Sequence, residues 1–343
     1  MSTNQDELFR LVELFATSEQ VKQLLRLAKD HEAVRITAEN KSDLIQRNLR
    51  SAVASKAITL DQVYGLVREA EENGGQHIFY FKPRNKTVAE SMAFESVAKQ
   101  LWGTDWQKKM SFPNVKTAKN HFVYGDFRLW NPTKKPLDWM LKLYGHMQFE
   151  RFTGEEKQED GGLWRLFVPE DLRIVLIARW NSPDLLELRV QRDQSRKRIN
   201  SWLAEIWKML GPALDKGNID AWDLSKARRR MIDEEQKNQH IYQFRDTRLE
   251  DSVSNRMSFE SHATQGNLFA STEAKQAIND VLAAKNSRCT HLSVNWLPTK
   301  DGTLSREYRT LLGDREAHEV IFSAQCSAAE VDYVTDKLRY FSR

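Results

Sequence analysis

Apolar residues recur at helical spacing in four stretches near the start of the chain. The pattern i, i+3, i+4, i+7 occurs in residues 8–15 and 21–28, and further apolar stripes of helical type occur in residues 45–53 and 60–70. Thr17 with Gln20 and Thr59 with Gln62 have the spacing of capping boxes, which predicts helix starts at both places. Each predicted helix has a single apolar face, so we expect the four to pack as a bundle. A strand-like run over residues 77–81 then leaves this bundle.

The rest of the chain alternates between strand and helix patterns. Strands are expected at 163–168, 172–179, 185–191, 292–296, 306–312 and 320–322, and helices at 87–101, 196–210, 271–285 and 331–341. Turn residues at Pro169–Asp171 and Asn181–Asp184 are expected to separate the first three strands. Successive strands followed by a helix favour an antiparallel α+β layer.

These patterns predict an α+β fold in three parts. The first is a four-helix module over residues 1–82, and the second is a basic α/β region over residues 83–230. The third part, residues 231–343, is an antiparallel sheet with flanking helices that ends in a meander and a helix. No tandem repeat or low-complexity tract interrupts this order.

Composition narrows the class of protein. The 343 residues are 40% hydrophobic and 29% charged, which permits a packed core and excludes general disorder. No apolar run approaches the length of a membrane span, and the polar start does not resemble a signal peptide. Two cysteines exclude a disulfide scaffold. We therefore expect a soluble intracellular protein, either cytoplasmic or associated with DNA in a nucleoid or nucleus.

Positive charge is concentrated in the middle of the chain. The formal net charge is +4, but residues 82–144 carry 12 basic and 5 acidic side chains, a net of +7. Residues 161–230 carry 14 against 9, a net of +5, and contain dense clusters at 196–198 and 226–230. Such clusters attract a phosphate backbone because its neutralisation releases counterions. The alternative is an ordinary solvated basic face.

Aromatic side chains interleave with lysines between residues 103 and 136, a combination that suits nucleic acid, although most of the rings are expected in the core. A further candidate clamp lies in the third predicted helix, where two arginines follow a lysine at the helix start. The residues predicted to contact DNA are Lys41, Arg47, Arg50, Lys108, Lys109, Lys116, Lys119, Arg196, Lys197, Arg198, Arg228, Arg229 and Arg230.

Catalytic signatures are missing from the sequence. Neither a phosphate-binding glycine loop nor the HExxH and GxSxG motifs occur, so no catalytic residue, metal or cofactor is predicted. The best metal-ligand candidates, Cys289 and His291 with His318 and Cys326, lack the paired spacing of a zinc site. Asp184 with Glu187 and Arg189 weakly resembles the carboxylates and cation of a Mg²⁺-dependent nuclease.

Two resemblances point toward DNA. Residues 40–49 resemble the second half of a SAP-type DNA-binding box, in which a lysine precedes a Leu-Ile-x-Arg-x-Leu helix. The order of elements, the stretch from Val21 to Lys82 and the C-terminal strands resemble the centromere protein N family. That resemblance implies a pyrin-like bundle followed by an α/β body, DNA contact through Lys41, and dimerisation through the C-terminal sheet.

The leading hypothesis is a non-catalytic DNA-binding or DNA-associated protein that contacts the phosphate backbone through the central basic clusters. A metal-dependent nuclease is the first alternative. The second is a protein-interaction adaptor whose helical module recruits a partner and whose body self-associates through a sheet edge. No membrane partner is expected.

Overall fold

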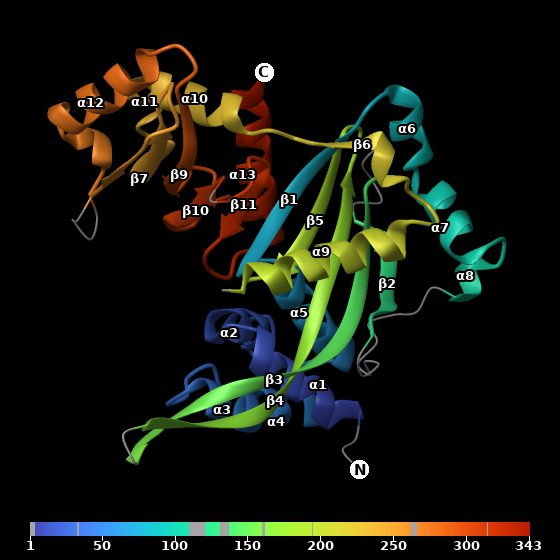
Figure 1. The fold of residues 1–343 in the computed structure, drawn as a ribbon. Coiled ribbons are helices and arrows are strands. Elements are labelled where there is room, and N and C mark those ends of the chain that lie inside the picture. Colours follow the sequence, from blue (N-terminus) through green and yellow to red (C-terminus); the bar gives the residue numbers. More distant parts are fainter. Residues whose placement is uncertain are drawn as a thin grey trace. The chain divides into compact units, whose positions relative to one another are not determined.

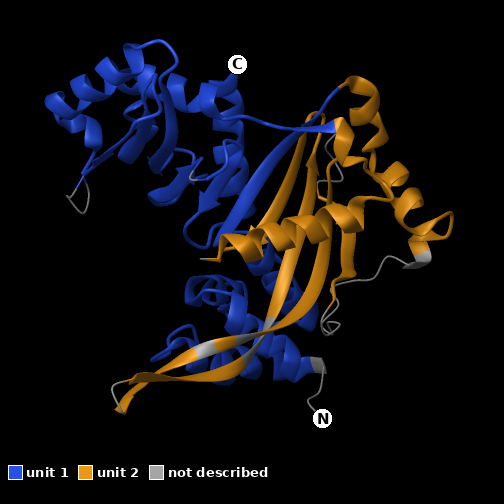
Figure 2. Ribbon diagram, in the orientation of Figure 1, with its two compact units in different colours: residues 1–84, 219–343 blue, residues 85–218 orange. Residues whose placement is uncertain are grey.

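The computed structural model describes residues 4–32, 34–109, 121–130, 137–159, 162–193, 195–261, 266–313 and 315–343. The chain forms two compact units (Figure 2). Unit 1 combines residues 1–84 with residues 219–343, and unit 2 consists of residues 85–218. The predicted helical module and the predicted C-terminal sheet therefore belong to one unit, because strands far apart in the sequence pair with each other.

Unit 1 begins with the expected helical bundle (Figure 1). Its helices are α1 (Asn4–Phe15), α2 (Ser18–Arg26), α3 (Lys41–Asp43), the π-helix η1 (Leu44–Leu49), α4 (Arg50–Ala54) and α5 (Leu60–Glu72). Both predicted capping boxes are formed, at Thr17 and at Thr59. Phe9, Val21 and Ile45 are fully buried, so the apolar faces do pack against one another.

The remainder of unit 1 is an antiparallel sheet. Its strands are β1 (Gln76–Pro83), β6 (Ile219–Ala221), β7 (Tyr242–Glu250), β8 (Arg256–Glu260), β9 (Arg288–Trp296), β10 (Tyr308–Leu312) and β11 (Glu319–Phe322). The pairing runs β6–β1–β11–β10–β9–β7–β8, and every pair is antiparallel. Strand β1, which follows the bundle directly, therefore lies beside β11 from the end of the chain.

Helices cover this sheet. They are α10 (Ser225–Asp233), α11 (Glu235–Asn238), α12 (Thr272–Ala283) and α13 (Ala328–Ser342), with a 3-10 turn η3 (Leu268–Ala270) before α12. The Tyr80 hydroxyl lies 2.9 Å from the Thr335 hydroxyl, and the Tyr242 ring packs 5.6 Å from the Phe341 ring. Helix α13 therefore covers the face of the sheet that carries these two tyrosines.

Unit 2 consists of four antiparallel strands with helices. It contains α6 (Lys86–Ser91), α7 (Phe94–Trp102), α8 (Trp106–Lys109), β2 (Val123–Leu129), β3 (Trp139–Glu159), β4 (Gly162–Asn181), β5 (Leu185–Gln191), α9 (Arg196–Leu210) and η2 (Lys216–Asn218). The strands pair in sequence order, and α9 crosses one face of β3–β5 (Figure 1). An aromatic cluster around Phe94, Phe127 and Trp139 forms much of the core.

The α+β class is confirmed, and so are most expected elements. Two local predictions are wrong. Residues 169–171 do not form a turn, because β4 continues through them with Pro169 paired opposite Glu150 on β3. The helix expected over 87–101 is interrupted at Met92–Ala93, where α6 ends and α7 begins. In the part of the chain that the structure describes, no helix has the length and hydropathy needed to cross a membrane.

Candidate phosphate-binding site

Lys41 is engaged within the helical bundle. Its side chain is half-buried at the start of α3, and its Nζ donates a hydrogen bond to the main-chain oxygen of Glu13 at the end of α1. Burial lowers the pKa of this ammonium group. Lys41 therefore ties two helices together and presents only part of its side chain to a ligand.

Arg47 and Arg50, predicted to share one helix face, have separate partners. The exposed Arg47 guanidinium lies 3.2 Å from Asp43, one turn earlier. Arg50 pairs with Asp6 at 2.8 Å and lies 4.4 Å from the centre of the Phe9 ring. Arg50 thus joins α4 to α1, and each of the two arginines is already paired with a carboxylate.

The central lysines fall largely outside the described residues. Lys108 and Lys109 lie in the short helix α8, but their side chains are outside the description, and Lys116 and Lys119 are outside it altogether. Their role in DNA contact stays a prediction.

The cluster at 196–198 opens helix α9. Arg198 forms two hydrogen bonds to Asp193, at 2.9 Å and 2.8 Å, so a neighbouring carboxylate already balances its charge. Lys197 is exposed and Arg196 is half-buried. The described part of this cluster therefore offers one exposed lysine beside one neutralised arginine.

The cluster at 228–230 does not act as one patch, because consecutive residues of a helix point about 100° apart. Arg229 pairs with Asp233 at 3.0 Å, and Arg230 pairs with Glu234 at 2.7 Å. Arg228 alone is buried, and it points into a cavity of the C-terminal sheet. Of the three predicted contacts, only Arg228 contributes to a concentrated positive site.

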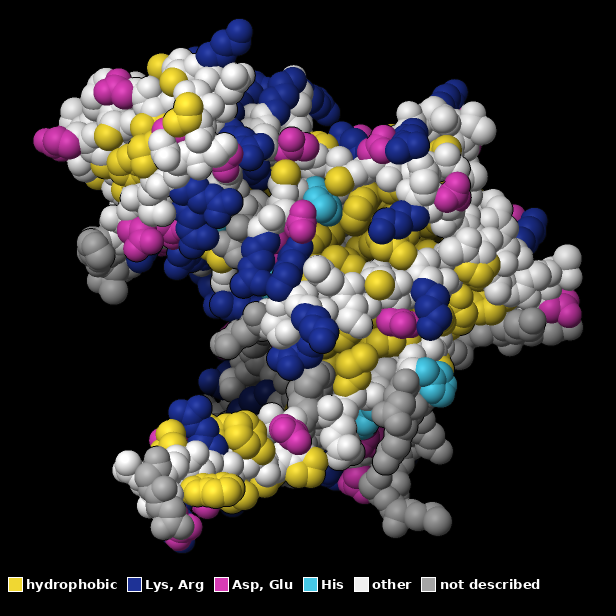
Figure 3. Space-filling model, in the orientation of Figure 1, with side chains coloured by type: hydrophobic (Ala, Val, Ile, Leu, Met, Phe, Trp, Pro, Cys, Tyr) yellow, Lys and Arg dark blue, Asp and Glu magenta, His cyan; other side chains and the backbone are white. Residues whose placement is uncertain are grey.

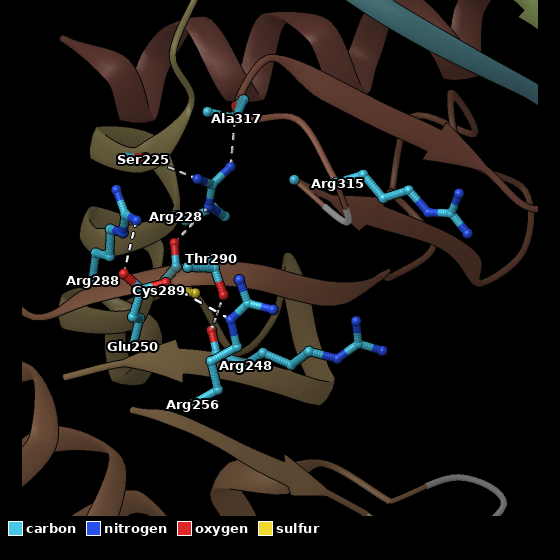
Figure 4. Close-up of a pocket in the computed structure, with 11 residues that line it drawn as sticks. Ser225, Arg228, Arg248, Glu250, Arg256, Arg288, Cys289, Thr290, Arg315 and Ala317 are labelled. Carbon is cyan, nitrogen blue, oxygen red and sulfur yellow. Dashed lines mark hydrogen bonds and ion pairs between the residues drawn. The ribbon is translucent and has the colours of Figure 1, made fainter. Parts of the chain in front are cut away.

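That cavity, which we call the arginine pocket, has a volume of about 480 Å³. Among the described residues, five arginines and a single carboxylate line it, from α10, β7, β8, β9 and the β10–β11 turn (Figure 4). The charged residues are Arg228, Arg248, Glu250, Arg256, Arg288 and Arg315. In the space-filling view, Lys and Arg side chains gather over the C-terminal strands of unit 1 (Figure 3).

Strand register explains why these arginines meet. Glu250 at the end of β7 is directly opposite Arg256 on β8 and also opposite Arg288 on β9. Its carboxylate lies 2.8 Å from Arg288 and 3.9 Å from Arg256. Arg248 precedes Glu250 by two residues, so strand alternation places it on the same side. One buried carboxylate thus organises a row of exposed cations.

Arg228 forms the inner wall of the pocket. Its Nε donates to the Cys289 carbonyl at 2.9 Å, its Nη1 to the Ala317 carbonyl at 3.2 Å, and its Nη2 to the Ser225 hydroxyl at 2.8 Å. Burial lowers the pKa of this guanidinium, but an arginine remains charged at neutral pH. Three uncharged acceptors therefore hold the Arg228 guanidinium in position without neutralising its positive charge.

The net charge of the pocket is strongly positive. Its described lining residues carry five guanidinium groups against one carboxylate, a balance of +4. Asp223 lies close enough to Arg228 and Arg288 for both to favour its ionised form, which reduces the local balance to +3. Burial alone would raise the pKa of Asp223. The hydrogen bonds from Ser225 and the positive charges of Arg228 and Arg288 outweigh this effect, so the pKa is lowered. The pocket therefore suits an anion with several oxygen atoms.

A glycine makes room for Arg228. Gly313 has a φ of +72°, and a Cβ added there would lie 2.3 Å from Arg228 Nη1 and 2.9 Å from the Thr290 carbonyl. An alanine at this position would be strained in its backbone and would also displace the buried guanidinium.

We expect Gly313→Ala to lower the free energy of unfolding by about 1–3 kcal/mol, measured by urea denaturation. Gly302→Ala is the matched control, because Gly302 has a similar φ of +77° and a Cβ added to it would meet nothing within 4 Å. Backbone strain alone would make the two substitutions equally costly. Equal losses would therefore show that Gly313 has no packing role beside Arg228.

Glu187, a candidate metal ligand in the nuclease alternative, is already paired with two arginines. Glu187 is fully buried in unit 2 and accepts hydrogen bonds from Arg189 at 3.0 Å and 2.6 Å, and Arg179 lies 3.8 Å away. A carboxylate between two guanidinium groups is a poor ligand for Mg²⁺, which requires oxygen donors free of competing cations.

The cysteine and histidine candidates also have other partners. His291 Nε2 lies 2.8 Å from Asp246, Cys289 Sγ lies 3.2 Å from the His291 carbonyl oxygen, and the His318 ring packs on Phe81. Over the described ranges, no group of three or more His, Cys, Asp or Glu side chains is arranged to hold a metal ion.

No family model matches this chain, and no curated protein matches it. The arrangement of the side chains is therefore the basis for a functional proposal.

Proposed function

We propose that this is a non-catalytic DNA-binding protein whose arginine pocket receives phosphate groups of the backbone. One observation carries the proposal: five arginines from five separate elements line one cavity, together with a single carboxylate among the described residues. Under this proposal the protein works where DNA is present, in a nucleoid or nucleus.

The chemistry of the pocket suits phosphate better than a carboxylate ligand. A guanidinium group presents parallel N–H donors in a planar fork that matches two phosphate oxygens. Arg228 is held in place by its three acceptors, so little conformational freedom is lost when a ligand binds. The exposed Arg248, Arg256 and Arg288 can contact neighbouring phosphates along a strand.

The charge distribution of the whole chain supports a polyanion over an isolated phosphate. Residues 82–144 carry a net charge of +7 and residues 161–230 a net charge of +5, and such an excess of positive charge attracts polyanions. The resemblance to the centromere protein N family points to the same class of ligand, although it assigns contact to Lys41.

Salt dependence provides the direct test. If the pocket neutralises three to four phosphates, the affinity for a short DNA duplex should fall roughly 40- to 150-fold between about 50 mM and 200 mM salt. Fluorescence anisotropy with a labelled duplex of mixed sequence would measure the affinity at each salt concentration.

Two outcomes would contradict the proposal. The first is no DNA binding at about 50 mM salt, and the second is an affinity that salt leaves unchanged, because phosphate contacts always release counterions. The same duplex incubated with Mg²⁺ or Mn²⁺ provides a check on catalysis. Cleavage by the wild type would favour the nuclease alternative over the proposal.

A further inference from the structure

Strands β3 and β4 extend beyond their neighbours as a two-stranded ribbon. In the described pairings, β2 accompanies β3 only as far as Tyr144, and β5 accompanies β4 only from Leu176 onward. The β3–β4 pairing nevertheless continues to Glu159 opposite Gly162. We call residues 150–159 and 162–169 the β-arm; it is the long hairpin of unit 2 in Figure 1.

Exposed apolar side chains are concentrated on the β-arm. Half of the large hydrophobic residues that are exposed in the described chain lie there: Phe152 (38%), Leu163 (57%), Trp164 (66%), Leu166 (49%) and Phe167 (49%). A two-stranded ribbon has no second layer in which to bury such side chains. Clustered exposure of this kind marks an interaction surface.

The faces of the ribbon, and not its edges, are suited to association. Pro169 removes a backbone donor from β4. On β3 the register shifts between Phe152 and Glu156, where Gly154 has a φ of +89°. A proline and a bulge are both devices that discourage strand addition at a sheet edge.

One face carries a self-complementary pattern. Phe152 is opposite Phe167, with the rings 5.6 Å apart, and two residues farther along β4 the Arg165 Nε lies 2.8 Å from Glu156. Leu163 follows on the same side. Two successive levels of this face therefore place an aromatic ring opposite an aromatic ring and an acid opposite a base, and at the third level Leu163 is opposite Gln158.

We propose that the β-arm is a dimerisation element that packs face to face on the arm of a second copy of this chain. A two-fold axis along the ribbon places β3 of one copy over β4 of the other. Glu156 then faces the second copy's arginine, and Phe152 faces the second copy's Phe167. An axis across the ribbon at the level of this ion pair would place Glu156 on Glu156 instead, so charge favours arms that point in the same direction.

The opposite face of the β-arm lacks this complementarity. Trp164 and Leu166 are exposed there, but Lys157 and Glu159, which form an ion pair, both lie on β3. The same two-fold operation would place both charges over β4, where no opposite charge meets them. The Phe152 face is therefore the one that fits a second copy. This proposal does not depend on DNA binding.

The test exploits charge reversal on the full chain. Glu156→Arg gives two arginines at this level of the arm, and Arg165→Glu gives two glutamates. Each variant alone should self-associate at least about tenfold more weakly than the wild type, whereas an equimolar mixture should recover the wild-type affinity. The double variant E156R/R165E should also recover it. Sedimentation velocity over a range of concentrations would measure each dissociation constant.

Two controls keep the result specific. Phe167→Ser should weaken the dimer, while Leu27→Ser, at a residue that is 75% exposed outside the arm, should leave it unchanged. Circular dichroism and thermal denaturation establish that each variant is folded. A wild type that stays monomeric at the highest concentration overturns the proposal. So does a dimer that the single reversals leave intact, or a mixture that associates no better than its components.

Discussion

Replacing Glu187 by alanine should destabilise the protein by about 3–5 kcal/mol, one of the two largest effects that the structure predicts. The carboxylate is fully buried and accepts hydrogen bonds from Arg189 and Asn181, with Arg179 opposite it on β4. Its removal leaves two buried guanidinium groups without their shared counter-charge. Urea denaturation followed by circular dichroism would measure the loss.

The pH dependence of this effect has a definite sign. Burial would raise the pKa of Glu187, but the charges of Arg189 and Arg179 and the hydrogen bonds outweigh it, so the pKa is lowered. A lowered pKa adds stability above the ordinary glutamate pKa, and this stability disappears as the pH falls through the folded-state value. The difference between wild type and Glu187→Ala should therefore shrink on acidification from about pH 7 to about pH 3.

Leu188→Ala provides the matched control. Leu188 is the next residue on β5, is fully buried on the other face of the sheet, and loses packing without loss of charge. Its cost should not depend on the ionisation of Glu187. A Glu187→Ala loss below about 1 kcal/mol, or one that is the same at both pH values, would show that the buried ion pairs do not stabilise unit 2.

Local pattern was sufficient to predict most helices and many strands, because each depends on residues close together in the sequence. The capping boxes at Thr17 and Thr59 both form as their spacing indicates. Pairing between distant strands could not be predicted in this way. The adjacency of β1 and β11, for example, joins His77 to Ile321 and so unites the two ends of the chain in unit 1.

The candidate site was harder to predict because its residues are scattered along the sequence. Among its arginines only Arg228 belongs to a visible cluster, and the others lie singly at 248, 256, 288 and 315. The alternation of Tyr242 and Phe244 with Gln243 and Arg245 was the available signal for β7. A search for runs of basic residues could not find the pocket, for a geometric reason. Neighbouring arginines on a helix point in different directions, whereas paired strands bring together arginines that are distant in the sequence.

The other large effect should follow from reversing three charges at the arginine pocket. The variant R248E/R256E/R288E should bind DNA about 100- to 1,000-fold more weakly than wild type at about 0.1 M salt, with the slope of log K against log salt reduced by about 3. All three side chains are exposed at the pocket, but the reversal also removes the two ion pairs of Glu250, so circular dichroism must establish that the variant is folded. Fluorescence anisotropy across a salt series would yield both quantities.

A charge-matched variant separates the pocket from general attraction. The variant R26E/K86E/K99E replaces three exposed cations outside the pocket, each of which lies beside a carboxylate. Like the pocket variant, it lowers the formal net charge by six, from +4 to −2. An equal loss in this control would mean that net charge alone attracts DNA.

The variant K108E/K109E/K116E/K119E tests the lysines predicted from the sequence. If it loses affinity while the pocket variant retains it, the phosphates bind at those lysines and not at the pocket, because only the true contacts contribute to counterion release.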